Sequence, residues 1–238
     1  MKKVLWAFAA LLAASTTARA DVIAQWTFET APPADLNNST TITGIAADFG
    51  SGTASGVHAS AATDWTTPAG NGSANSLSVN TWTVGDYFQF QTSTTGFDDI
   101  TVSWDQTGSA TGPAEFTLSY STDGTNFTNF ANYSTIANAA PPGFWNATTA
   151  FTEYTQSFNL SAIASLEDAT DVFFRLVNRS TLSLNGGTVA AGGTGRVDNF
   201  TVNGLAVAGV PEPGSILLTS VAFGGMALVR RRRMKATS

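Results

Sequence analysis

The chain has 238 residues, of which 43% are hydrophobic and only 12% are charged, about half the ~25% of an ordinary globular protein. This composition supports a buried core and excludes a coiled coil, a highly charged disordered chain and a basic nucleic-acid-binding domain. The absence of cysteine excludes disulfides, zinc thiolates and cysteine nucleophiles, and the single histidine, His58, leaves little material for a histidine metal site.

The first twenty residues have the three parts of a secretory signal peptide. Two lysines precede an apolar run over residues 4–14, and Ala18 and Ala20 form an A-x-A cleavage site. The apolar run is too short to span about 30 Å of hydrocarbon, which argues against an uncleaved anchor. We therefore expect export by the Sec translocon and cleavage by signal peptidase after Ala20, which leaves residues 21–209 as the exported domain.

The exported domain is predicted to be all-β, an antiparallel β-sandwich or jelly roll. Apolar and polar residues alternate with a period of two, which is typical of strands that bury one face. Nine segments carry the pattern, and only Ala162–Leu166 hints at a helical turn. The predicted strands are Val22–Phe28, Leu77–Trp82, Tyr87–Gln91, Asp99–Asp105, Ala114–Ser121, Phe127–Tyr133, Tyr154–Leu160, Val172–Val177 and Val197–Val202.

Three local patterns refine this prediction. Asp123 and Gly124, between two predicted strands, indicate a hairpin with a tight type I′ turn. Val172–Val177 is nearly all apolar, so it is expected to be a central strand. The stretch Thr30–Gly72 is rich in small and polar residues, and it is predicted to form either long loops or edge strands of uncertain register.

Two short motifs mark the first and last predicted strands. Phe28 is followed by Glu29 at the end of the first, and Asp198 is followed by Asn199 in the last. This layout resembles jelly-roll carbohydrate-binding modules. The resemblance implies that the two strands lie side by side and that Glu29 and Asp198 bind a structural calcium ion. Carboxylate oxygens suit Ca²⁺, but a strand-end glutamate and a surface aspartate without a metal would give the same pattern.

Catalytic motifs are weak, and we predict that the protein is not an enzyme. His58 lies in a segment without a G-x-S-x-G nucleophile elbow, so we expect a surface residue rather than a catalytic base. The glycine-rich run 192–195 lacks the lysine of a phosphate-binding loop. A secreted hydrolase that uses a carboxylate pair on glycans stays open as an alternative, because glycoside hydrolysis needs only two acidic residues.

Aromatic side chains in polar loops are candidates for glycan contact, because sugars stack on exposed rings. Phe144 and Trp145 follow a Pro-Pro-Gly turn and are the best candidates, since a loop with two adjacent aromatic residues cannot easily bury both. Trp65 and Trp82 lie in similar polar surroundings. The alternative is that these rings cap the core of the sandwich.

The last residues, 210–238, form a second three-part signal. Its uncharged run, residues 214–229, would form a helix of about 24 Å. Such a helix can act as one transmembrane span if flanking arginines snorkel and the bilayer thins. The arginines would remain in the cytoplasm and the domain outside. In chain order, the parts are Pro211, Glu212, Pro213, the uncharged run 214–229 and the arginines Arg230, Arg231, Arg232 and Arg233.

This order of motif, span and basic cluster resembles the PEP-CTERM sorting signal of Gram-negative bacteria. The resemblance implies that an exosortase, a multi-pass membrane enzyme, recognises and removes the tail, so that attachment to the membrane is transient. It also implies an association with exopolysaccharide and biofilm production. An ordinary C-terminal anchor that is never cut is the alternative.

Removal of both ends changes the charge of the protein. Between residues 21 and 208, three arginines against sixteen acidic residues give a formal net charge of −13, and no lysine remains. Such a surface repels phosphate backbones, so no nucleic-acid partner is expected. Together, the two terminal signals, the weak catalytic motifs and the aromatic residues in loops favour a structural or adhesive protein of the cell surface or extracellular matrix, in contact with glycans. The PEP-CTERM resemblance implies that such a glycan is an exopolysaccharide.

Overall fold

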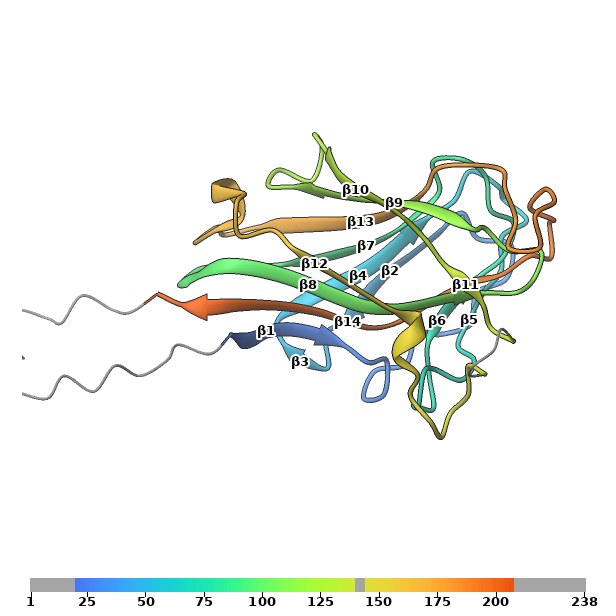
Figure 1. Ribbon diagram of the computed structural model, residues 1–238, viewed down its shortest axis with the longest axis horizontal. Helices are drawn as coiled ribbons and strands as arrows, with labels where there is room; N and C mark the ends of the chain where they lie inside the picture. Colours follow the sequence, from blue (N-terminus) through green and yellow to red (C-terminus); the bar gives the residue numbers. More distant parts are fainter. Residues whose placement is uncertain (1–19, 140–143, 208–238) are drawn as a thin grey trace, which may run out of the picture. The chain divides into compact units, whose positions relative to one another are not determined.

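The computed structural model describes residues 20–139 and 144–207 (Figure 1). The predicted signal peptide, apart from Ala20, and the predicted sorting signal, 210–238, lie outside the described residues. Among the described residues, no helix is long and apolar enough to cross a membrane. These residues form two β-sheets that pack against each other, as the alternating sequence pattern predicts.

The larger sheet has eight strands in the order β11-β8-β14-β1-β3, with β12 paired to β8, β6 to β14 and β5 to β6. All pairs are antiparallel except β11 with β8. The first strand lies beside the last, because β1 pairs with β14. The strands are β1 (Asp21–Trp26), β3 (Phe49–Gly50), β5 (Trp65–Thr66), β6 (Leu77–Val79), β8 (Phe97–Gly108), β11 (Ile136–Ala137), β12 (Thr155–Asn159) and β14 (Gly195–Ala206).

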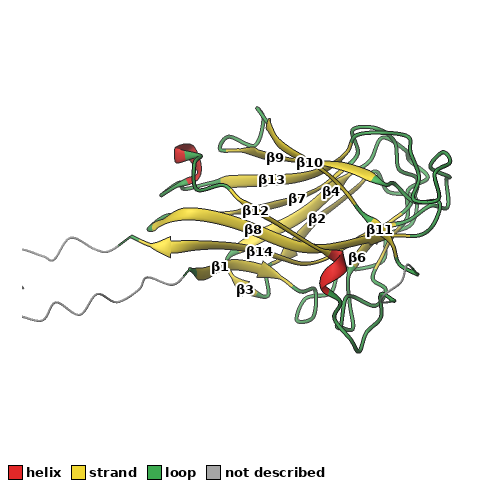
Figure 2. Ribbon diagram, viewed as in Figure 1, coloured by secondary structure: helices red, strands yellow, loops and turns green. Residues whose placement is uncertain are grey.

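The smaller sheet has six antiparallel strands in the order β10-β9-β13-β7-β4-β2. Its strands are β2 (Thr41–Ala46), β4 (Gly52–Val57), β7 (Tyr87–Thr92), β9 (Glu115–Ser121), β10 (Thr128–Ser134) and β13 (Val172–Asn178). The described helices are two short 3-10 turns, η1 (Thr152–Tyr154) and η2 (Ala164–Leu166). Loops make up the described residues outside the strands and these two turns (Figure 2). The second turn lies where the sequence predicts one.

Aromatic side chains from both sheets form the centre of the core. The Phe90 ring of β7 stacks on the Phe200 ring of β14 at a centroid distance of 3.7 Å, and Trp26 of β1 meets Phe90 edge-on at 5.3 Å. Such pairs add to the free energy gained by burying their large apolar area. The core therefore joins the two sheets through residues at the inward positions of the predicted strands.

All nine predicted strands are confirmed, and Val172–Val177 forms β13 between β7 and β9, as expected for a central strand. The predicted hairpin between β9 and β10 is also confirmed, but the predicted type I′ turn is wrong. That turn needs positive φ at two consecutive residues, whereas in this loop only Gly124 has one, +71°. Asp123 instead accepts hydrogen bonds from the backbone nitrogens of Thr125 and Asn126 and supports a longer loop.

The stretch Thr30–Gly72 contains an internal strand that its composition hides. Strand β4 lies between β2 and β7, and its inward positions hold Gly52, Ala54 and Gly56. A Cβ at Gly52 would lie 2.7 Å from the Trp26 ring, and a Cβ at Gly56 would collide with the Trp65 ring. Small residues are needed here because tryptophans from the opposite sheet fill the space, so the usual alternation of large apolar residues is missing.

Candidate functional site

The outer face of the six-stranded sheet presents polar and aromatic side chains. In β7, Phe88 and Phe90 point into the core, so Tyr87, Gln89 and Gln91 point outward and are half-buried. The neighbouring strand β13 places Arg175 opposite Gln89. These outward positions form one continuous strip across the middle of the sheet.

Arg175 is fixed in the centre of this strip. Its Cζ lies 4.0 Å from the ring centroid of Tyr87 and 3.6 Å from that of Phe127, which comes from the loop before β10. Its Nε donates a hydrogen bond to Gln89 Oε1 at 2.7 Å. Burial lowers the pKa of Arg175 from its ordinary value, but a guanidinium stays protonated in proteins. Two rings and one amide therefore hold a positive charge in a set position.

The other end of the Arg175 guanidinium has no partner among residues 20–139 and 144–207. No hydrogen bond joins Nη1 or Nη2 to a described residue, and no described carboxylate forms an ion pair with it. Both nitrogens thus retain their capacity to donate hydrogen bonds to something outside the domain.

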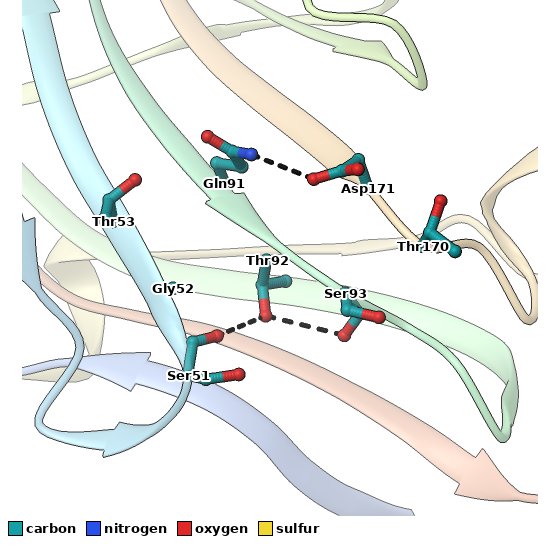
Figure 3. A pocket seen from close by; sticks show the side chains of 8 residues that line it. All are labelled: Ser51, Gly52, Thr53, Gln91, Thr92, Ser93, Thr170 and Asp171. Carbon is teal, nitrogen blue, oxygen red and sulfur yellow. Dashed lines mark hydrogen bonds between the residues drawn. The ribbon is translucent and has the colours of Figure 1, made fainter.

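A pocket of about 300 Å³ opens at the end of the same strip (Figure 3). In its wall, Gln91 donates from Nε2 to Asp171 Oδ1 at 2.9 Å, and the Thr92 hydroxyl donates to the Ser51 carbonyl at 2.7 Å. Hydroxyls, an amide and a carboxylate make up the polar side chains of the wall, so the pocket both donates and accepts hydrogen bonds. The lining residues are Ser51, Gly52, Thr53, Gln91, Thr92, Ser93, Thr170 and Asp171.

The outer face of the eight-stranded sheet holds a different polar group. Asn199 has a φ of +53° at a bulge in β14, and its Nδ2 donates to Asp105 Oδ2 at 2.9 Å and to Asp198 Oδ2 at 3.2 Å. Thr155 Oγ1 donates to Asp105 Oδ1 at 2.6 Å. The fold thus brings two carboxylates together across β8 and β14, beside a pocket of about 280 Å³ that includes Asp105 and Asn199.

Asp198 is sealed beneath the segment 70–76. Its side chain is 0% exposed, and its Oδ2 accepts hydrogen bonds from Asn71 N at 2.9 Å and Ser73 Oγ at 2.7 Å. Burial raises its pKa to about 7, although hydrogen bonds from Ser73, Asn71 and Asn199 oppose the shift. A carboxyl group with no exposed surface cannot reach a substrate, so this pair lacks the open geometry of a glycosidase.

The two residues expected to bind calcium meet the same segment. Glu29 Oε1 accepts a hydrogen bond from Asn75 N at 2.7 Å, and Asp198 holds Asn71 and Ser73. Oxygens of Ser73, Asn75 and Asp198 crowd around Gly70, where no Cβ would fit. They are oxygen types that Ca²⁺ accepts, but the Ser73 hydroxyl already links the other two through hydrogen bonds. Among the described residues, no group of three or more His, Cys, Asp or Glu side chains could hold a metal.

The predicted glycan-contact pair is divided between the surface and the interior. Phe144 is 60% exposed, whereas Trp145 is 7% exposed, donates from Nε1 to the Ala69 carbonyl at 2.6 Å and meets the Tyr154 ring edge-on. Trp145 therefore does not present its ring to solvent, and Phe144 alone does. Trp65 and Trp82, which also lie in polar stretches of sequence, are buried as well.

His58 is a core residue, so its expected surface position is wrong. It is 2% exposed and lies against the rings of Trp65 and Trp82, at centroid distances of 5.0 and 4.4 Å. Its Nδ1 lies 3.5 Å from Asp86 Oδ2. Burial lowers the pKa of His58 to about 4, and the Asp86 charge only partly offsets this. His58 lies two residues after Gly56, so it continues the inward-facing positions of β4. A prediction of β4 from the sequence would therefore also have predicted that His58 is buried.

Comparison with known proteins finds similar folds and no matching family. No protein-family model and no curated protein sequence matches the chain. Solved structures align over 54–76% of it, at 11–16% identity. The chain spans a little over a quarter of the xylanase structure among them, but nearly all of the adhesin structure.

One of these structures contains the CBM22-1–GH10 modules of endo-1,4-beta-D-xylanase 10B from Clostridium thermocellum complexed with xylohexaose; it is 14% identical, covers 76% of this chain and 28% of that chain, and has a TM-score of 0.40. The K3 cleaved adhesin domain of Lys-gingipain from Porphyromonas gingivalis is 15% identical, covers 76% of this chain and 98% of that chain, and has a TM-score of 0.40. TmCBM61 in complex with beta-1,4-galactotriose is 13% identical, covers 74% of this chain and 90% of that chain, and has a TM-score of 0.29. At these identities and scores, the likeness does not extend to a ligand or a site.

Proposed function

We propose that the exported domain binds glycans on the outer face of its six-stranded sheet and has a structural or adhesive rather than an enzymatic role. The observation that carries the proposal is the hydroxyl-lined pocket at the end of the strip formed by Tyr87, Gln89 and Gln91. Sugars offer hydroxyls that both donate and accept hydrogen bonds, and their apolar faces pack on rings. The strip offers both kinds of contact.

The proposal is tested by the affinity of the purified protein for a glycan array, followed by titration of the best ligand. Gln91→Ala removes the amide from the pocket wall, and we expect it to weaken binding about 10-fold, the usual effect of losing one well-formed polar contact. Thr155→Ala on the other sheet is the matched control and should leave the affinity unchanged. Equal loss in both variants would reject the proposed face.

A carboxylate-pair hydrolase remains the alternative activity. The burial of Asp198 argues against the Asp105 and Asp198 pair as its catalytic groups. The two activities differ in outcome, because a binding domain leaves its glycan intact. Release of new reducing ends from a bound glycan would replace the binding proposal with the enzymatic one.

The two ends of the chain support a proposal about delivery. We infer that residues 1–20 direct export and that Pro211, Glu212 and Pro213, with the run 214–229 and the arginines after it, direct processing by an exosortase at the membrane. The domain would then be released to the cell surface or to an exopolysaccharide matrix or biofilm. Mass spectrometry of the surface form tests this, because an intact tail with Arg230–Arg233 would favour an uncut anchor instead.

Calcium binding near Glu29 and Asp198 belongs to the same proposal. The contacts of both carboxylates with the segment 70–76 support calcium binding, together with the oxygens around Gly70. Added Ca²⁺ should raise the melting temperature, because a ligand that binds only the folded state stabilises it. Glu29→Gln should reduce the rise. Identical melting in Ca²⁺ and in a chelator would reject the idea.

A further inference from the structure

The strip on the six-stranded sheet carries a positive charge that nothing in the described part of the domain neutralises. Of the described arginines, Arg179 pairs with Glu115 at 3.1 Å, and Arg196 on β14 has its Nε buried without a partner. Arg175 differs from both because two rings and an amide fix it in place. The segment has sixteen acidic residues, yet none of those that the structure describes forms an ion pair with Arg175.

The residues around Arg175 hold its guanidinium in an orientation that can bind a planar anion. The rings of Tyr87 and Phe127 cover the guanidinium, and Gln89 takes the Nε hydrogen. The remaining donors, on Nη1 and Nη2, match two oxygens of one carboxylate in a bidentate pair. Because the side chain is already held in position, binding costs less conformational entropy than it would for a free arginine.

The position of Arg175 selects the kind of molecule that carries the carboxylate. Gln89, which anchors Arg175, is two residues from Gln91 in the pocket, a distance of about 7 Å along a strand. A short oligosaccharide spans that distance, so one sugar can fill the hydroxyl-lined pocket while a neighbouring sugar reaches Arg175. An acidic peptide would supply the carboxylate but not the hydroxyls that suit the pocket.

We propose that Arg175 binds the carboxylate of a uronic acid residue, so that the ligand of this face is an acidic glycan. The inference rests on the proposed glycan-binding function and adds the chemical class of the ligand. The net charge of −13 between residues 21 and 208 repels dense polyanions at long range. The ligand is therefore a polysaccharide with isolated uronic acids among neutral sugars rather than a polyuronate.

Calorimetry with three probes tests this inference. The probes are an oligosaccharide with one glucuronate per repeat, its carboxyl-reduced neutral counterpart and a peptide with isolated glutamates among neutral residues. The purified protein should bind the uronate probe about 10-fold more tightly than the reduced one, since a bidentate charged pair contributes on that scale. Arg175→Lys keeps the charge but loses the planar fork, so it should lower this preference and retain the affinity for the reduced probe. Arg179→Gln removes a positive charge from the end of the same strand and should change neither affinity.

The outcomes separate this inference from the proposed function. Equal binding of both saccharides, or a preference that is undiminished in Arg175→Lys, overturns the acidic ligand and leaves glycan binding in place. Binding of neither saccharide overturns both, and tighter binding of the peptide with isolated glutamates assigns Arg175 to acidic peptides instead. If Arg175→Lys does not fold, Phe127→Leu takes its place, since Phe127 lies in a loop. Loss of one ring should lower the preference about threefold, and an unchanged preference would overturn the inference.

Discussion

The outer faces of the two sheets are both polar, but they use their polar groups differently. On the eight-stranded sheet, Asp105 accepts hydrogen bonds from Thr155 and Asn199, so its network is closed within the domain. On the six-stranded sheet, Arg175 keeps two nitrogens without a partner among the described residues, beside a hydroxyl-lined pocket. A satisfied network stabilises the fold, whereas preorganised groups with spare capacity bind a ligand.

The largest expected effect falls on stability at the closed network. Asp198→Ala leaves buried donors of Asn71, Ser73 and Asn199 without their acceptor, so we expect it to lower the free energy of unfolding by about 3 kcal/mol. Asp198→Asn keeps an acceptor oxygen and should cost less than half as much. Denaturant unfolding measures both, and similar values for the two variants would show that the hydrogen bonds are not the cause.

Acid should weaken the region beside β4. The folded-state pKa of His58, about 4, lies below its ordinary value of 6.5, so the unfolded chain binds the proton more readily. Stability from His58 is therefore full above pH 6.5 and falls as the pH drops towards 4, by about 3 kcal/mol. His58→Phe fills the space without titrating, and its unfolding free energy should vary less over this range. Parallel pH profiles for the two proteins would contradict the assignment.

A reciprocal pair of variants compares the two faces directly. Thr155→Ala removes a hydrogen bond to Asp105 and should cost about 1 kcal/mol of stability without affecting glycan affinity. Gln91→Ala should show the reverse, with weaker binding and a stability change within about 0.5 kcal/mol, because its partner Asp171 is exposed. Unfolding curves and titrations on both variants check the pair, and a shared loss of affinity would show that the faces do not differ in function.

The smallest expected effect is at Phe144. Its ring is 60% exposed and lies in a loop outside the six-stranded sheet, so Phe144→Ala should change stability by no more than about 0.5 kcal/mol. If the proposed face is the whole site, glycan affinity should stay within about twofold, a few tenths of a kcal/mol. A larger loss of affinity would show that the loop of Phe144 contacts the glycan, as the sequence predicts.

Local patterns predict the strands well because apolar and polar residues alternate along each predicted strand, and this alternation is visible in the sequence. They miss β4 and the burial of His58 for one shared reason. The inward positions of β4 are small so that Trp26 and Trp65 can fill the space, and the size of a partner from another strand is not visible in the segment itself. The division between Phe144 and Trp145 is missed because adjacent residues in a loop have no fixed period.

The sequence predicts the strands of the candidate face but not the face itself. Tyr87 and Gln89 occupy outward positions of one predicted strand, Arg175 that of another and Phe127 the start of a third. Their contact depends on the strand order β9-β13-β7 and on the path of the loop before β10. Neither follows from alternation, which gives the face of each residue but not its neighbours.

Chemical-shift mapping by NMR tests the central claim most directly. Titration of the purified protein with a uronate-containing oligosaccharide should move the amide and side-chain signals of Gln89, Gln91 and Arg175 and leave those of Asp105 and Thr155 unchanged. Shifts confined to β8, β12 and β14, or to the loop of Phe144, would contradict it.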